Sequence, residues 1–248
     1  PLEPDLALAR RYVAAHPPTG ELLLVALTGA HLYGFPSVDS DLDLKGMHLA
    51  PRERLLGLFP PPETHDRLEV FEGVECDLTT HEAAKGLGLL LKGNGNLLEQ
   101  ITSPFQVCSP DLEALRALVP HALSKRVYGH YAGYFKGMCR EHRSRMRVKS
   151  LLYSFRVALT GEHLLRTGEV QAHLPTLAHT YGLPELDGLV ERKRSDEKGL
   201  LTPEESAPYE ALWPARAEAL RDALATSALP DAPDPRPLDA WLVERRCS

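Results

Sequence analysis

The chain has 248 residues, of which 43% are hydrophobic and 25% are charged, and its formal net charge at pH 7 is −6. This composition is that of a soluble globular protein with one large or two modest domains, and no apolar run reaches the eighteen residues that a membrane-spanning helix needs. The N-terminal segment has the pattern of an amphipathic helix with early acidic residues rather than that of a secretory signal. The four cysteines form no CxxC pair, so we expect reduced thiols in a cytoplasmic protein and no structural zinc site.

The first part of the chain predicts a helix, a strand, a turn with a short helix and a second strand. The helix is expected at about 4–15, and the first strand at about 22–28, where an apolar run ends in Thr28-Gly29-Ala30. The second strand, at about 40–49, begins with the sequence Asp-Leu-Asp-Leu. Residues i and i+2 of a strand point to the same face, so Asp41 and Asp43 should project side by side while the leucines enter the core.

Two adjacent carboxylates on a rigid strand repel each other unless a cation lies between them. Asp41 and Asp43 would give the oxygen-rich half-site that Mg²⁺ prefers, with positions left for phosphates and water. The pattern therefore predicts a magnesium or manganese site used for metal-assisted phosphoryl or nucleotidyl transfer. Lys45 follows on the same face, where it would neutralise phosphate charge or balance the carboxylates.

A second strand-like run covers 67–80, after a proline-rich loop at 59–63. Its alternation places two sets of residues on opposite parities: Leu68, Val70, Val74 and Cys76 on one, and Phe71, Gly73, Glu75 and Asp77 on the other.

Helices are expected to dominate the rest of the chain, at about 81–92, 96–101, 111–118, 121–143, 148–167, 174–181 and 203–225. The segment 227–237 is rich in Pro and Asp and indicates a linker or surface segment, followed by a short helical tail at about 238–246. Strands early and helices late predict an α+β fold, with a small mixed-sheet catalytic domain at 1–108 and an all-helical domain at 109–248.

The window from Lys125 to Arg166 contains ten Lys and Arg against two acids, Glu141 and Glu162, which gives it a charge of about +8. Aromatic residues are interleaved with the basic ones, and their helical spacing favours a core position for the aromatics. For the basic residues we favour contact with a polynucleotide backbone, chiefly through Arg143, Arg145, Arg147 and Lys149.

Three stretches resemble a known family: GAHLYGFPSVDSDLDLKG at 29–46, LLLKGNGNLLEQITSP at 89–104 and the basic segment at 145–170. Together they are similar to the DNA polymerase β-type nucleotidyltransferase superfamily, and to its branch of bacterial nucleotidyltransferases associated with RNA-repair operons. The resemblance covers roughly residues 20–170, and the last eighty or so residues carry no motif that we can place.

The resemblance implies a metal-dependent transfer of a nucleoside monophosphate from an NTP to an acceptor hydroxyl, with RNA as the expected acceptor. It assigns catalysis and metal binding to Asp41, Asp43 and a third carboxylate on a neighbouring strand. That third carboxylate would bind metal and act as base. Asp77 is the better candidate, because it should end the strand just before a helix, and Glu75 is the alternative. Nucleotide contacts are expected from Thr28, Gly29, Ala30, His31, Lys45, Lys92 and Asn94.

One departure from the family concerns Ala30, where the family usually has a serine that helps to hold the triphosphate. The backbone N–H groups of the turn can still bind phosphate, and Thr28 could supply a hydroxyl. His31 and Tyr33 have two interpretations, contact with the base or ribose of the nucleotide and, for Tyr33, packing under the loop.

Several alternatives stay open. The chain could be a non-catalytic nucleic-acid-binding or antitoxin-like module with a degenerate site, and the acceptor could be tRNA, a protein hydroxyl or a small molecule. A weaker hypothesis is RNA cleavage by Arg156 and His163, which share one helix. The oligomeric state and the transferred base are not indicated.

Overall fold

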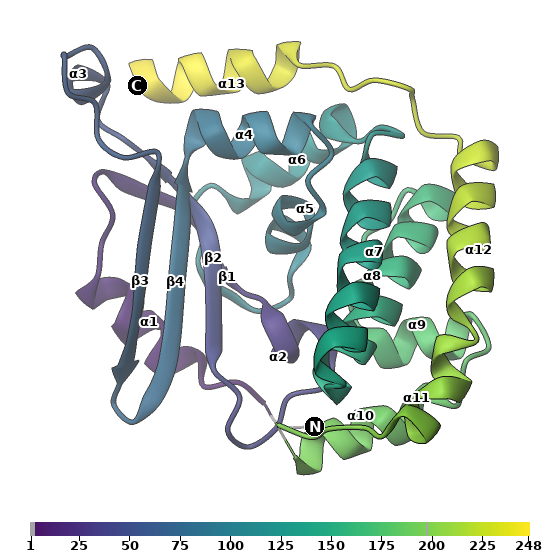
Figure 1. Cartoon of the computed structure of the whole chain (residues 1–248). Coiled ribbons are helices and arrows are strands. Elements are labelled where there is room, and N and C mark those ends of the chain that lie inside the picture. Colours follow the sequence, from purple (N-terminus) through teal and green to yellow (C-terminus); the bar gives the residue numbers. More distant parts are fainter. Residues whose placement is uncertain (1–2, 197) are drawn as a thin grey trace.

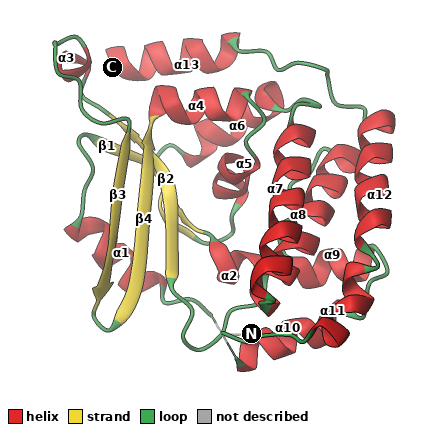
Figure 2. Cartoon of the chain, viewed as in Figure 1, coloured by secondary structure: helices red, strands yellow, loops and turns green. Residues whose placement is uncertain are grey.

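The computed structural model describes residues 3–196 and 198–248, and it has a β-sheet on one side and a large group of helices on the other (Figures 1 and 2). The five strands lie in the order β3-β4-β2-β1-β5. Strands β2 and β4 are parallel, whereas the other neighbours are antiparallel, so the sheet is mixed. The α+β class is therefore confirmed. The strands are β1 (Glu21–Leu27), β2 (Leu42–Leu49), β3 (Thr64–Phe71), β4 (Val74–Glu82) and β5 (Gln106–Cys108).

One face of the sheet is covered by helix α1 (Leu6–Ala15). Leu42 and Leu44 of β2 and Cys76 and Leu78 of β4 point into this layer and are buried with the apolar side of α1. The alternation of leucines and aspartates in β2 thus places its leucines under α1 and its aspartates on the opposite face.

The opposite face is covered only in part, by helices that follow the sheet in the chain (Figure 1). Met47 of β2 packs there among α4 (Ala83–Leu91) and α5 (Gly95–Thr102). Next to them lie α7 (Val127–Arg145) and α8 (Val148–Thr167), of which α8 is almost wholly buried. The remaining helices are α2 (Gly29–Tyr33), α3 (Arg52–Leu55), α6 (Leu112–Ala122), α9 (Leu174–Thr180), α10 (Leu186–Ser195), α11 (Pro203–Glu210), α12 (Trp213–Thr226) and α13 (Arg236–Cys247).

The larger hydrophobic core is continuous from the sheet to the late helices. It includes Leu24 of β1, Leu97 of α5, Leu151 of α8 and Leu238 of α13, all nearly inaccessible to solvent. The division at residue 108/109 stays a prediction, and residues from both sides of it share this core. Among the residues that the structure describes, no helix is both long and apolar enough to cross a membrane.

The run at 67–80 is not one strand but a hairpin. Glu72 and Gly73 form its turn with φ values of +49° and +86°, the left-handed geometry of a tight two-residue connection. The hairpin pairs Val70 with Glu75 and Leu68 with Asp77. Cross-strand partners point to the same face, so Leu68 and Val70 share the face of Asp77 and not that of Cys76, and they are 66% and 69% exposed.

Several expected boundaries also differ. The helix expected at 203–225 is two helices, because Pro214 lacks the N–H that a continuous helix would need and starts α12 instead. The helix expected at 121–143 begins at Val127, after a turn in which the Lys125 N–H donates to the carbonyl of Pro230. The segment 227–237 has no helix before Arg236, and the tail is the helix α13. Strand β5 and helix α10 were not expected.

Candidate active site

The parallel pairing of β2 with β4 places Asp43 directly beside Asp77 and Lys45 directly beside Thr79. These four residues lie on the sheet face opposite α1. Asp77 is the fourth residue of β4, which continues to Glu82, so the expectation that Asp77 ends its strand is wrong. Glu75 lies two residues before Asp77 on the same face of β4. It is exposed and pairs with Val70 of β3.

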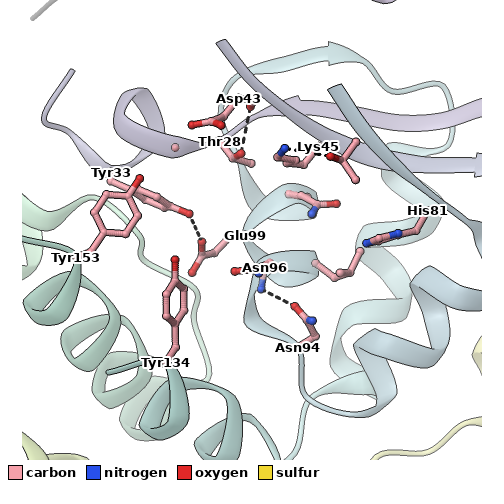
Figure 3. A pocket seen from close by; sticks show the side chains of 14 residues that line it. Thr28, Tyr33, Asp43, Lys45, His81, Asn94, Asn96, Glu99, Tyr134 and Tyr153 are labelled. Atoms are coloured by element: carbon pink, nitrogen blue, oxygen red, sulfur yellow. Dashed lines mark hydrogen bonds between the residues drawn. The ribbon is translucent and has the colours of Figure 1, made fainter. Parts of the chain in front are cut away.

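A pocket of about 290 Å³ opens next to Asp43 (Figure 3). The sheet supplies one wall, and the segment around α5, together with α7 and α8, supplies the other. Its polar and aromatic lining consists of Thr28, Tyr33, Asp43, Lys45, Thr79, His81, Asn94, Asn96, Glu99, Gln100, Tyr134 and Tyr153.

The turn before α2 closes tightly on Asp43. The Thr28 N–H and hydroxyl both donate to the Asp43 carbonyl, at 2.8 and 3.1 Å. Gly29 has a φ of +64°, and a Cβ at this position would lie 1.9 Å from Asp43 Oδ2. Only glycine allows both this backbone geometry and the close approach of the carboxylate. The Thr28 hydroxyl, expected as a possible phosphate donor, is engaged with the backbone.

The pKa of Asp43 is raised to about 6, chiefly by burial and then by the nearby charge of Asp41, whereas Lys45 and Lys149 act in the opposite direction. Asp41 lies just before β2. A buried carboxylate that is repelled by a second one is better satisfied by a cation, and two carboxylates with added phosphate and water oxygens suit Mg²⁺. Asp41 and Asp43 therefore fit a divalent ion as a two-carboxylate half-site.

Asp77 does not complete a set of three in this structure. Its Oδ2 accepts a bond from Lys45 Nζ at 2.6 Å, and Nζ also donates to Thr79 Oγ1 at 3.1 Å. Within 3–196 and 198–248, no group of three or more His, Cys, Asp or Glu residues is arranged to hold a metal ion.

A second charged group forms the far end of the pocket, and the sequence did not reveal it. The Glu99 carboxylate accepts bonds from Arg156 Nη1 at 2.6 Å and from the Tyr33 hydroxyl at 3.0 Å. The Arg156 guanidinium is fully buried, lies 3.9 Å from the centre of the Tyr33 ring and is also near the rings of Tyr134 and Tyr153. Its Nε and Nη2 have no hydrogen-bond partner among the described residues. The place of Arg156 between Phe155 and Val157, in an apolar stretch of α8, is the signal that could have indicated a buried ion pair.

A comparison with known families finds one that matches most of the chain. The model of RlaP, the RNA repair pathway DNA polymerase beta family, matches residues 8–244. The chain belongs to this family. The expected resemblance is confirmed, and the match extends well beyond 20–170 into the late helices.

The RlaP assignment makes the chain a nucleotidyltransferase-like protein of an RNA repair family. Among curated proteins, none matches this chain. A crystal structure of a nucleotidyltransferase-like protein from Exiguobacterium sibiricum 255-15 is 13% identical with a TM-score of 0.32, and the alignment covers 97% of this chain and 75% of that one. That similarity is too low to support an argument about this RlaP member.

The structure separates the expected nucleotide contacts into two sets. Thr28, Gly29, Lys45 and Asn94 line the pocket. The remaining three do not line it: Ala30 is buried in the core, His31 lines a different cavity with a pKa that burial lowers, and Lys92 is exposed after α4. For Tyr33, the bond to Glu99 and the burial of the ring favour the packing interpretation over contact with a ribose.

The basic residues expected to bind RNA lie where α7 meets α8. Arg143 is paired with Glu210, and Arg145 with Glu141. Arg147 is exposed at the start of α8, whereas Lys149 is half-buried and close enough to Asp43 to lower its pKa. The first three are therefore exposed, with Arg143 and Arg145 each beside a glutamate, and Lys149 lies on the side of the candidate active site.

The two residues of the RNA-cleaving hypothesis do not act on a common site. Arg156 is sealed from solvent against Glu99, while the His163 imidazole is hydrogen-bonded to the Tyr181 hydroxyl at 3.2 Å. A guanidinium without solvent access cannot contact an RNA phosphate, so the structure gives this hypothesis no support.

Proposed function

We propose that this RlaP-family chain transfers a nucleoside monophosphate from an NTP to a hydroxyl of RNA, with Mg²⁺ or Mn²⁺. The single observation that carries the proposal is that Asp43, which lines the open pocket beneath the Gly29 turn, lies directly beside Asp77 of the neighbouring strand. Charge neutralisation and positioning are most of what phosphoryl transfer requires, and paired carboxylates next to lysines provide both.

In this proposal Asp41 and Asp43 hold the divalent ion, which would neutralise phosphate charge and make the reacting phosphorus easier to attack. Asp77, on the neighbouring strand, would complete the metal site and take the proton of the attacking hydroxyl on a carboxylate oxygen. Lys45 and Lys149, which both act on the Asp43 carboxylate, offset the negative charge of the triphosphate. Pyrophosphate leaves as the new phosphodiester bond forms.

The acceptor is assigned to RNA on two grounds. The family is described as belonging to an RNA repair pathway. In addition, the exposed surface formed by Arg143, Arg145 and Arg147 lies on the helices that lead into the pocket wall. Such a surface attracts a phosphate backbone, and each neutralised phosphate releases counterions.

The test incubates the protein with each labelled NTP in turn, Mg²⁺ or Mn²⁺ and RNA. Label that is gained by RNA supports the proposal. Label on the protein itself would instead indicate nucleotidylylation, and RNA retention without any transfer would indicate a non-catalytic binding module.

The RNA assignment is tested by reversing Arg143, Arg145 and Arg147 to Glu. We expect weaker RNA binding at every sequence and a shallower dependence of affinity on salt, because fewer phosphates are neutralised. Arg116→Glu, an exposed change on α6, is the control. RNA affinity that is the same at low and moderate salt would contradict a phosphate-binding surface.

A further inference from the structure

Lys45 is paired with Asp77, one of the three carboxylates of the proposed site. Its side chain leaves β2 on the same face as Asp43 and reaches across to β4, where Nζ contacts Asp77 Oδ2 at 2.6 Å and Thr79 Oγ1 at 3.1 Å. The Asp77 carboxylate is therefore neutralised by an ammonium group of the chain itself.

The described residues contain no cluster of three carboxylates placed to hold a metal ion, although the strand register brings Asp43 and Asp77 side by side. A divalent ion that approached Asp77 would meet the positive charge of Lys45 within a few ångströms, and such repulsion is strong in a partly buried site. The ion and the ammonium group thus compete for the same carboxylate.

The pairing can be broken without rearranging the fold. The Lys45 side chain is only a quarter exposed, but it lines the pocket and ends in a compact charge on a flexible four-carbon stem. Triphosphate oxygens in the pocket would offer that ammonium group a more highly charged partner than a single carboxylate.

We propose that Lys45 is an internal counter-cation that occupies Asp77 in the empty site and is drawn away by the phosphates of the incoming nucleotide. Free divalent ions then bind weakly, and full three-carboxylate binding arises only when metal and nucleotide are both present. The inference rests on the proposed function, because it assumes that the carboxylates hold a metal.

The test measures the affinity for Mn²⁺ alone by electron paramagnetic resonance, without nucleotide and without any activity assay. Lys45→Met keeps the length of the stem and removes the charge, so we expect it to bind Mn²⁺ at least about tenfold more tightly than the unmodified protein. Lys125→Met removes a lysine from another Lys–Asp pair, Lys125 with Asp231 at 2.9 Å, and should leave Mn²⁺ affinity unchanged. Circular dichroism melts confirm that each variant is folded.

Adding α,β-methylene-ATP tests whether a nucleotide draws Lys45 away from Asp77. In the unmodified protein the nucleotide analogue should increase Mn²⁺ affinity strongly, and in Lys45→Met it should increase it by a much smaller factor, because Asp77 is already released. An equal increase in both proteins would overturn the inference.

Asp43→Asn distinguishes a failure of the Lys45 inference from a failure of the proposed metal site. If Mn²⁺ binding depends on Asp43 but Lys45→Met does not strengthen it, the inference about Lys45 is overturned and the proposed site stands. If Mn²⁺ binding is unaffected by Asp43→Asn, the metal site of the proposed function is overturned together with the inference.

Discussion

Two groups of charged residues lie near the same pocket and differ in how far each is closed to solvent. At one end, Asp43 and Asp77 lie side by side on the partly exposed face of the sheet, and the Lys45 ammonium group is bonded to Asp77. At the other, Glu99 and Arg156 are sealed from solvent and held by tyrosine rings and a hydroxyl. The contrast shows that ionic character alone does not identify a reactive centre. The group that we propose as reactive is the one that is open to a ligand, and we expect the closed group to hold the pocket wall in place.

The strongest test of this contrast removes the charge of Asp43. Asp43→Asn should lower nucleotidyl transfer by several orders of magnitude, because metal positioning and charge neutralisation are lost. The fold should survive, since relieving repulsion between carboxylates does not destabilise it. Label transfer and thermal melts measure the two effects, and Asp39→Asn, in the exposed loop before β2, is the control. Near-normal transfer in Asp43→Asn would remove the reactive role from this end of the pocket.

For the closed group, Glu99 and Arg156, we expect a loss of stability when one partner is removed. Glu99→Ala leaves the Arg156 charge buried without its partner, and we expect the free energy of unfolding to fall by about 3–5 kcal/mol. Urea denaturation measures the change. Glu113→Ala breaks the exposed pair with Arg116 and should cost less than about 1 kcal/mol. A similar cost for the two variants would mean that Glu99 and Arg156 do not support the pocket wall.

The pH dependence of stability should also distinguish the two ends. Because the pKa of Asp43 is raised from 3.8 to about 6, the folded state binds this proton more tightly than the unfolded state. The Asp43 contribution to stability should therefore increase as the pH falls from about 7 through 6 to about 4, by at most about 3 kcal/mol. Urea denaturation in the presence of a chelator measures the free energy of unfolding of the unmodified protein and of Asp43→Asn at each pH. The difference between the two proteins gives the Asp43 contribution. Parallel pH profiles would show that the carboxylate is not desolvated.

The smallest effect is expected from a single hydroxyl of the closed group. Tyr33→Phe removes the bond to Glu99 but keeps the ring against Arg156, so it should cost about 1–2 kcal/mol of stability. Tyr181→Phe, which removes a hydroxyl from the less buried contact with His163, provides the comparison and should cost less. A greater loss from Tyr181→Phe would place the more important tyrosine bond outside the pocket.

The end of the pocket that contains Asp43, which we propose as reactive, was largely predictable from the sequence, because its residues belong to short local patterns. The alternation of Asp and Leu at 41–44 sets which face each side chain takes, and Gly29 marks the turn that approaches it. Local patterns did not reveal the hairpin, since Glu72-Gly73 lacks the usual turn sequence and a continuous strand would show the same alternation.

The closed end could not be predicted for a different reason. Glu99 and Arg156 are 57 residues apart, and no periodicity connects them. The pairing of Lys45 with Asp77 is likewise a consequence of the strand order, in which β4 lies beside β2 although β3 separates them in the chain. Contacts of this kind become visible only when the topology is known.

Helix α13 has a consequence for the order in which the molecule folds. Its Arg245 bonds Glu21 of β1 across 224 residues of chain, and its Arg246 bonds Glu82 at the end of β4 across 164 residues. Closing loops of this length is entropically unfavourable until the intervening chain is already compact, so pairings of this kind form late. During synthesis, the strand ends that carry Glu21 and Glu82 therefore lack these arginine partners until Arg245 and Arg246 have been made.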